Sequence, residues 1–140
     1  MSESVTINCS DLNQQKQAQL MLCSSNKSFY LFFKEYVPIK PFMTYSYSFE
    51  VGELISNQRV RIKNISKTYN DFCSLKRVLK QVYENEPGVD FDSLFPKPQF
   101  LRNNDPETIQ NRIRGFQKYF NTILQLPGIC DLDEVINFFS

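Results

Sequence analysis

The sequence predicts an α+β domain, in which a three-stranded antiparallel sheet packs against a helical subdomain with a proline-rich crossover loop. Three observations support this fold class. Residues 28–63 show the apolar–polar alternation of strands, and residues 70–83 and 105–126 show the three-to-four-residue spacing of amphipathic helices. Several prolines separate the two helical stretches. A run of strands followed by helices is typical of a sheet with helices covering one side.

Length and composition narrow the class of protein. A chain of 140 residues is one domain by default, and its 41% hydrophobic content, with 13 Phe and 7 Tyr, supports a packed core. The four cysteines have no CxxC spacing and there is no histidine, so we expect free thiols and neither a metal site nor a cofactor. No apolar run approaches the roughly 18 residues of a membrane span, and no signal-peptide pattern is present. We therefore expect a cytoplasmic protein.

The N-terminal residues 1–27 are expected to form a flexible or partly helical lead-in to a domain that covers residues 28–140. They are rich in Ser, Gln and Asn, which is typical of a poorly ordered tail. Asp11 is placed to cap one short helix within this segment.

Three strands are expected, over residues 28–36, 42–51 and 58–63. The first is rich in aromatic residues, and in the second Tyr, Phe and Val alternate with Thr, Ser and Glu. Prolines at positions 38 and 41 place a loop between them. In the third strand two apolar residues alternate with basic ones, which indicates a half-buried strand with a basic solvent face.

Positive charge is concentrated in and after this third strand. Between residues 59 and 80 seven basic residues face the single Asp71, a net charge of +6, whereas the whole chain carries +1. Concentrated charge suggests an anionic partner, although the strand face could equally be an ordinary exposed surface. The basic residues are Arg59, Arg61, Lys63, Lys67, Lys76, Arg77 and Lys80.

Helices are expected at about residues 70–83, from Asp105 to Leu126, and from Asp131 onwards. The long second helix has a strong start signal, a capping Asp followed by Pro and Glu, and Pro127–Gly128 ends it. The connection over residues 87–104 contains three prolines and favours an extended conformation. A connection of this length in a small domain is usually functional.

With these elements in place, the chain resembles the phox homology (PX) domain over roughly residues 28–140. Lys67–Leu75, KTYNDFCSL, resembles the family's strand end Arg-Arg-Tyr-Ser-Asp-Phe and the helix after it. Phe95–Pro98, FPKP, resembles its Pro-x-x-Pro-type loop. Ile109–Phe120, IQNRIRGFQKYF, resembles its helical pattern Ile-x-x-Arg-x-x-Gly-Leu-x-x-Phe. The order and spacing of the three segments make the resemblance specific.

The resemblance implies a phosphoinositide-binding, membrane-targeting module of sorting-nexin type, peripheral on endosomal or other endomembranes and serving protein transport. The family's ring-packing tyrosine corresponds to Tyr69, its hydroxyl-binding arginine to Arg112 and its loop lysine to Lys97. The full set of expected head-group residues is Arg112, Tyr69, Lys97, Lys67, Thr68 and Arg102.

One position departs from the family pattern. Thr68 stands where the family has the arginine that grips the 3-phosphate, and a hydroxyl cannot make that bidentate charged contact. The side chain of the adjacent Lys67 points to the opposite face of the strand, unless the backbone is irregular where the strand passes into the helix. Weak or atypical lipid specificity is therefore expected.

Several of these residues have a second interpretation. Tyr69 could be a core residue, and Arg112 a solvated charge or half of an ion pair. Apolar residues beside Lys40, in the segment with Pro38 and Pro41, and beside Arg102 could anchor the connections between elements or insert into a bilayer. These membrane-contact candidates are Val37, Ile39, Phe42, Phe100 and Leu101.

The alternative function is a protein-interaction domain, a scaffold or adaptor, on the same fold with a degraded lipid pocket. Pro38–Pro41 is a Pro-x-x-Pro segment of the kind that SH3-type grooves bind. We do not expect an enzyme, because the chain shows neither a phosphate-cradling glycine loop nor a catalytic constellation. A pI near 7.6 argues against nucleic acid as a partner.

Overall fold

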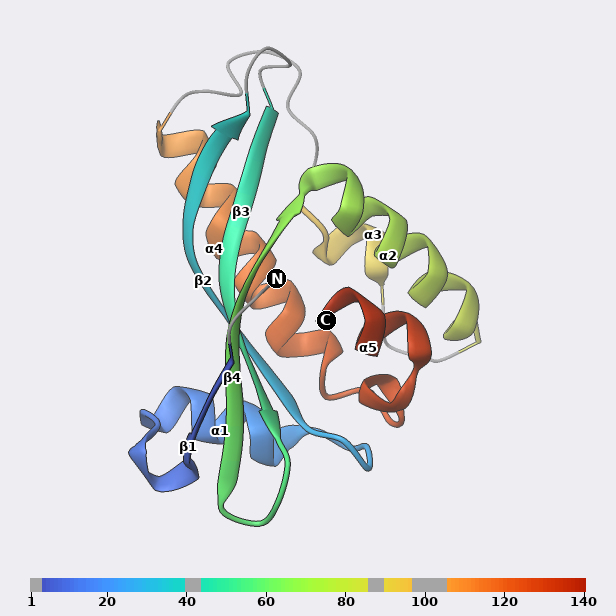
Figure 1. Ribbon diagram of the computed structural model, residues 1–140. Coiled ribbons are helices and arrows are strands. Elements are labelled where there is room, and N and C mark those ends of the chain that lie inside the picture. The colour runs from blue at the N-terminus through green and yellow to red at the C-terminus, as the bar shows by residue number, and fades with distance from the viewer. Residues whose placement is uncertain (1–3, 40–43, 86–89, 97–105) are drawn as a thin grey trace.

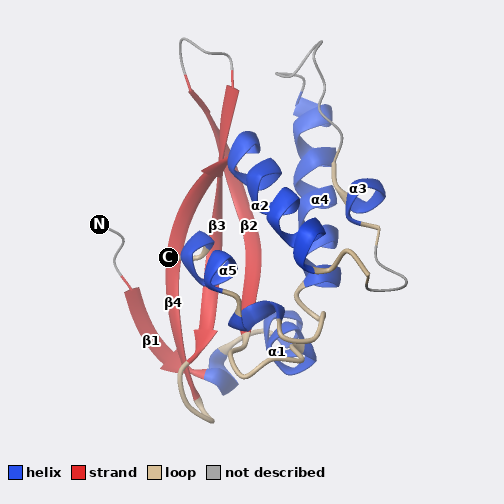
Figure 2. Cartoon of the chain, turned by 90° about the vertical axis from the view of Figure 1, so that its right-hand side faces the viewer, coloured by secondary structure: helices blue, strands red, loops and turns tan. Residues whose placement is uncertain are grey.

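The sheet organises the fold in the computed structural model, which describes residues 4–39, 44–85, 90–96 and 106–140. Its strands lie in the order β1-β4-β3-β2, and all neighbours are antiparallel. Figure 2 shows the long helices α2 and α4 beside it. The strands are β1 (Ser4–Asn8), β2 (Phe29–Ile39), β3 (Thr44–Leu54) and β4 (Arg59–Thr68). The helices are α1 (Gln14–Leu22), α2 (Tyr69–Val82), α3 (Phe91–Leu94), α4 (Pro106–Ile123) and α5 (Asp133–Phe138), with 3-10 turns η1 (Cys9–Asp11) and η2 (Ile129–Asp131).

The α+β fold class is confirmed, but the sheet has four strands where the sequence predicted three. The additional strand, β1, pairs with the first half of β4, from Ser4 opposite Lys63 to Asn8 opposite Arg59. It was missed because its five side chains are exposed or only partly buried, so it carries little apolar signal. Within the predicted lead-in, β1 pairs with β4, and η1 and α1 follow it.

Helix α1 begins two residues later than a cap at Asp11 would place it. The side chain of Asn13 accepts a hydrogen bond from Lys16 N (2.9 Å) and caps the helix, while Asp11 lies in η1. Leu12 and Leu20 are buried against β2 and β4. In Figure 1, α1 lies at the lower end of the sheet, on the side away from α2 and α5.

Strand β2 is longer than predicted and includes part of the expected proline loop. Val37, Pro38 and Ile39 pair with residues 44–46 of β3. Because β2 is an edge strand, a proline within it can place its nitrogen on the outer edge of the sheet. No hydrogen bond between strands is lost there, although proline has no N–H. The expected loop between the strands is correspondingly shorter.

Aromatic rings fill the layer between the sheet and helices α2, α4 and α5. Phe33 and Phe49 of the sheet contact Phe72 of α2 at centroid distances of 5.9 Å each. Phe72 in turn stacks on Phe116 of α4 at 4.4 Å. The helical stripes predicted from the sequence thus form the buried faces of α2 and α4, except at Val82, the last residue of the α2 stripe, which is exposed.

A carboxylate is buried on the other face, beneath α1. Glu50 of β3 is 9% exposed and accepts hydrogen bonds from Tyr30 Oη and from Lys16 Nζ (2.7 Å). Lys34 Nζ lies 3.8 Å away. Burial alone raises the pKa of this carboxyl, but the bonds from Lys16 and Tyr30 outweigh it, so the pKa of Glu50 lies below its ordinary value.

We expect Glu50→Gln to reduce the loss of stability at acid pH. The ionised carboxylate stabilises the fold above the ordinary pKa of 4.5, and this stability is lost as pH falls through the lower folded-state pKa. The variant should be about 1–3 kcal/mol less stable near neutral pH, with a smaller difference in acid. Urea unfolding from neutral to acid pH measures the stability difference and its decrease in acid. Glu53→Gln, at a more exposed carboxylate, is the control. Parallel pH profiles for Glu50→Gln and the parent would contradict this expectation.

Candidate functional site

The candidate site lies at the corner where β4 passes directly into α2. Thr68 ends the strand and caps the helix: its hydroxyl accepts from Asp71 N (3.3 Å), and the Asp71 carboxylate accepts from Thr68 N (2.9 Å). This reciprocal capping box fixes the angle between strand and helix. It therefore sets the position of Tyr69, the first residue of α2.

Tyr69 is held between the proline-rich segment and α4. Its hydroxyl donates to Pro96 O (2.6 Å), and its ring lies 5.6 Å from the Phe95 ring and 6.0 Å from the Phe116 ring. Burial raises the pKa of Tyr69 to about 12, so the hydroxyl stays protonated and remains a donor at neutral pH. The ring is only partly buried, so Tyr69 belongs both to the edge of the core and to the site.

Arg112 of α4 lies against this ring. Its Cζ is 4.8 Å from the Tyr69 centroid, a cation–π contact, and Nη1 donates to Tyr47 Oη (3.1 Å). Within the described ranges no acidic side chain forms an ion pair with Arg112. A guanidinium has five N–H donors in a planar fork, so this half-buried cation is oriented by two tyrosines and retains donors for an anion.

A glycine allows the proline-rich segment to approach α4. A Cβ built on Gly115 would lie 3.0 Å from Pro96 Cγ, which is closer than side chains normally pack. Because Pro96 O is the acceptor for Tyr69, this close approach helps to position the tyrosine. The glycine of the helical sequence pattern thus has a direct packing role.

Two of the remaining predicted head-group residues, Lys67 and Thr68, make other contacts. Lys67 extends toward α5, where its Nζ lies 5.0 Å from the Phe138 ring centroid. The Thr68 hydroxyl is engaged in the helix cap. Lys97 and Arg102 lie outside the described residues, as do the membrane-contact candidates Phe42, Phe100 and Leu101. Val37 and Ile39 are placed in β2, and nothing is described of their side chains.

The positive charge that the sequence concentrates between residues 59 and 80 is partly neutralised in space. Arg61 lies 3.5 Å from a Glu53 oxygen, and Asp92 pairs with both Lys76 (3.3 Å) and Lys80. Residues 59–63 also lie at the β1 end of β4, away from the corner with α2 (Figure 1). At about 3.3 Å per residue, Arg61 and Tyr69 are separated by over 20 Å of strand.

Two partners at the site were not predicted from the sequence. Tyr47 of β3 is fully buried and accepts from Arg112, and the backbone oxygen of Pro96 accepts from Tyr69. The sequence indicated Tyr47 only through the alternation of β3, which placed its side chain on the apolar face of a strand. Which helical residue faces it depends on tertiary packing, which the sequence pattern does not specify.

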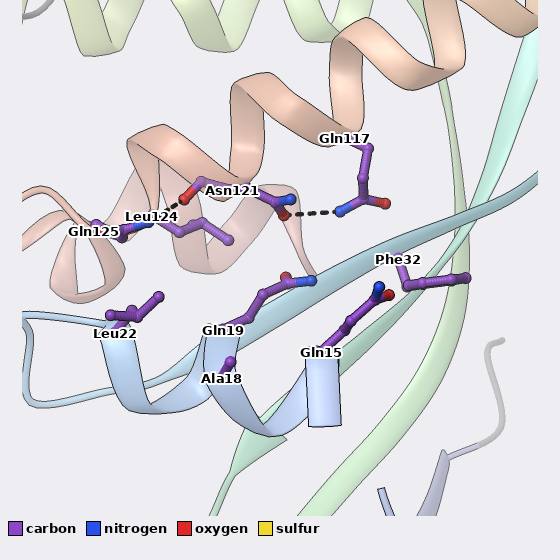
Figure 3. A pocket seen from close by; sticks show the side chains of 9 residues that line it. All are labelled: Gln15, Ala18, Gln19, Leu22, Phe32, Gln117, Asn121, Leu124 and Gln125. Carbon is purple, nitrogen blue, oxygen red and sulfur yellow. Dashed lines mark hydrogen bonds between the residues drawn. The ribbon is translucent and has the colours of Figure 1, made fainter. Parts of the chain in front are cut away.

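A pocket of about 410 Å³ lies elsewhere, between α1 and α4 beside β2 (Figure 3). Amide side chains dominate its lining, and none of its nine residues is charged. Gln19 accepts from Leu31 N (3.0 Å), while Gln117 donates to Leu31 O (2.7 Å) and accepts from Phe33 N (2.9 Å). These amides satisfy the outer backbone edge of β2, and they offer no cation to an anionic ligand.

A comparison with models of protein families matches residues 55–140 to the PX domain. The chain belongs to this family. A comparison with curated proteins gave no match. PX domains are phosphoinositide-binding modules that associate peripherally with membranes, and they are lipid-binding modules rather than enzymes. None of the helices in the described part of the chain combines the length and apolar composition needed to cross a membrane.

Proposed function

We propose that this PX domain binds phosphoinositide head groups at the Tyr69–Arg112 pair, with weak or atypical lipid preference, and recruits the chain to endosomal or other endomembranes. The observation that carries the proposal is the placement of Arg112. A half-buried guanidinium stacks on an aromatic ring, and the described residues offer it no carboxylate. An inositol phosphate supplies the hydroxyls and the negative charge that such a group binds.

The expected lipid preference follows from which cations lie near the Tyr69 ring. Arg112 is the cation that the described residues bring against Tyr69. Thr68 offers only a hydroxyl engaged in the helix cap, and Lys67 extends toward α5. Without a fork of donors at Thr68, the 3-phosphate loses its family partner, so discrimination among phosphoinositides should be weak.

The arrangement of the elements favours one end of the molecule as the membrane-facing end. In Figure 1 the far ends of β2 and β3 and the first turns of α2 and α4 lie toward the same end. Of the predicted membrane-contact residues, Val37 and Ile39 lie at the end of β2, Phe42 lies in the sequence between β2 and β3, and Phe100 and Leu101 lie in the sequence before α4. Insertion of these apolar residues into a bilayer would add affinity without lipid specificity.

Liposome flotation across a panel of phosphoinositides, each at low and high salt, tests the proposal. Binding in the site should persist at high salt better than diffuse attraction to anionic lipid, because salt screens exposed charges most. Binding that tracks only total negative charge and disappears with salt would contradict a head-group site. Absence of binding to every liposome would favour the protein-interaction alternative.

Thr68→Arg is expected to strengthen binding to phosphatidylinositol 3-phosphate. The arginine restores a donor fork beside Tyr69, at the cost of the helix cap, which contributes about 1 kcal/mol. Thr68→Ala is the matched control, because it removes the cap without adding charge. Flotation with this lipid and a thermal melt separate the two effects. Equal lipid binding by Thr68→Arg and Thr68→Ala would show that position 68 does not face the head group.

A further inference from the structure

Two segments that are distant in sequence are joined along a seam, which we define as residues 23–27 and 128–131. Four backbone N–H groups donate across this seam, and together they hold the end of α1 against η2. The bonds run from Gly128 N to Ser24 O (2.9 Å), from Cys130 N to Ser25 Oγ (3.1 Å), and from Asn26 N and Lys27 N to the Asp131 carboxylate (2.9 Å each). Asp131, where the sequence predicted that the last helix begins, instead accepts two of these bonds, and α5 begins at Asp133.

Two thiols meet in this seam. Cys130 Sγ lies 3.7 Å from Cys23 Sγ, which is van der Waals contact between two sulfurs. Cys130 is fully buried, whereas Cys23 is partly exposed at the end of α1. The hydrogen bonds of the seam fix the backbone next to each cysteine, so they hold the two sulfurs in contact.

The two sulfurs differ in their readiness to ionise. The Cys130 thiol donates to the sulfur of Cys23, and this bond lowers the pKa of Cys23 although burial opposes it, while the same bond raises the pKa of Cys130. When protonated, Cys23 has one S–H to donate, either to the carbonyl oxygen of Gln19 or to that of Phe29, each at 3.4 Å. The more exposed thiol is thus the one with thiolate character, and the buried one keeps its proton.

We propose that Cys23 and Cys130 are a redox modification site, which peroxides convert to an intramolecular disulfide. This assignment is independent of the lipid site, which lies at the β4–α2 corner. Cys9 and Cys73 are the other two cysteines; Cys9 lies in η1 and Cys73 in α2, so neither belongs to the seam.

The chemistry proceeds in two balanced steps. The Cys23 thiolate attacks one oxygen of hydrogen peroxide, which breaks the O–O bond, forms a sulfenic acid on Cys23 and releases hydroxide. The Cys130 sulfur then attacks the Cys23 sulfur, the S–O bond breaks, and the Cys130 proton leaves with the hydroxyl as water. The two thiols lose two electrons in total, and the peroxide accepts them.

Closing the bond needs only a small movement of the sulfurs. Their separation of 3.7 Å must fall to about 2.05 Å, a movement of less than about 2 Å between the two sulfurs. The new bond would close a loop that contains the whole of β2, β3 and β4. Because cross-links between distant residues restrict the unfolded chain most, the oxidised protein should melt about 5–15 °C higher than the reduced protein.

The test treats the reduced full chain with hydrogen peroxide and measures intact mass and non-reducing peptide maps. We expect a mass lower by two hydrogens, a linked peptide pair containing Cys23 and Cys130, and reversal by dithiothreitol. Cys73→Ser is the matched control and should form the same bond. In Cys130→Ser, Cys23 should instead remain as a sulfenic acid that dimedone captures.

If Cys130→Ser does not fold, measurements on the parent protein still test the proposal. In that case the linked peptide pair and the rise in melting temperature on oxidation remain measurable. Oxidation of Cys23 to a sulfinic acid with Cys130 still free, or a bond from Cys23 to Cys9 or Cys73, would overturn the assignment. So would recovery of both thiols unchanged under conditions that oxidise Cys9.

Discussion

Phe116→Ala is expected to destabilise the fold by about 3–5 kcal/mol, the typical cost of deleting a fully buried phenylalanine. Phe116 has no exposed surface and lies at the meeting point of the sheet, α2 and α4. Its ring contacts Phe72 (4.4 Å), Phe95 (5.4 Å) and Tyr47 (5.5 Å) between centroids. The surrounding rings belong to different elements, so they cannot collapse together into the space that truncation leaves.

Urea or thermal unfolding measures this effect, and a drop in melting temperature on the order of 10–20 °C is expected. Val82→Ala is the matched control, since Val82 is 50% exposed at the end of α2 and its loss should change stability by under about 0.5 kcal/mol. A Phe116→Ala protein that melts within a degree or two of its parent would contradict the placement of α4.

The helices were predictable because their burial signal is local. The spacing of Ile109, Phe116 and Phe120 indicated one face of a helix, and all three are buried. The Asp-Pro-Glu start signal placed the helix start at residue 105 or 106, and α4 begins at Pro106. Such signals need only neighbouring residues, which is why they can be read from one sequence.

The fourth strand and the cap of α1 were not predictable in the same way. β1 is stabilised by its backbone pairing with β4, more than fifty residues away, and its side chains are not buried. Asn13 rather than Asp11 caps α1 because η1 occupies residues 9–11. Both outcomes depend on how the N-terminal segment docks on the sheet.

The candidate site was predicted as separate residues, and the structure adds their arrangement. The resemblance pointed to Tyr69 and Arg112, which the fold brings to 4.8 Å from ring centroid to Cζ. The charge count suggested a broad basic surface, but Glu53 and Asp92 pair with several of these cations. Asp92 is outside the counted stretch, so the sequence pattern could not show this compensation.

Arg112→Ala is expected to lower the affinity for phosphoinositide liposomes about tenfold or more, because charged hydrogen bonds in a partly dry site contribute about 1.5–3 kcal/mol. The fold should survive, since Arg112 is only partly buried and the rings around it remain packed. Equilibrium liposome binding, together with a thermal melt of the same sample, separates lost affinity from lost structure.

Two control variants make the Arg112 result specific. Arg114 is exposed on the same helix, where its Nη1 donates to Asn111 (3.1 Å), so Arg114→Ala removes equal charge while leaving the Tyr69–Arg112 pair intact. Arg59→Ala removes a charge at the far end of β4, and any effect it has should vanish at high salt. If all three variants bind liposomes like the parent, the head-group site is wrong. If all three lose affinity equally and only at low salt, the protein is attracted to anionic lipid without a site. A loss confined to Arg112→Ala, and persisting in salt, is the result that the stacked guanidinium predicts.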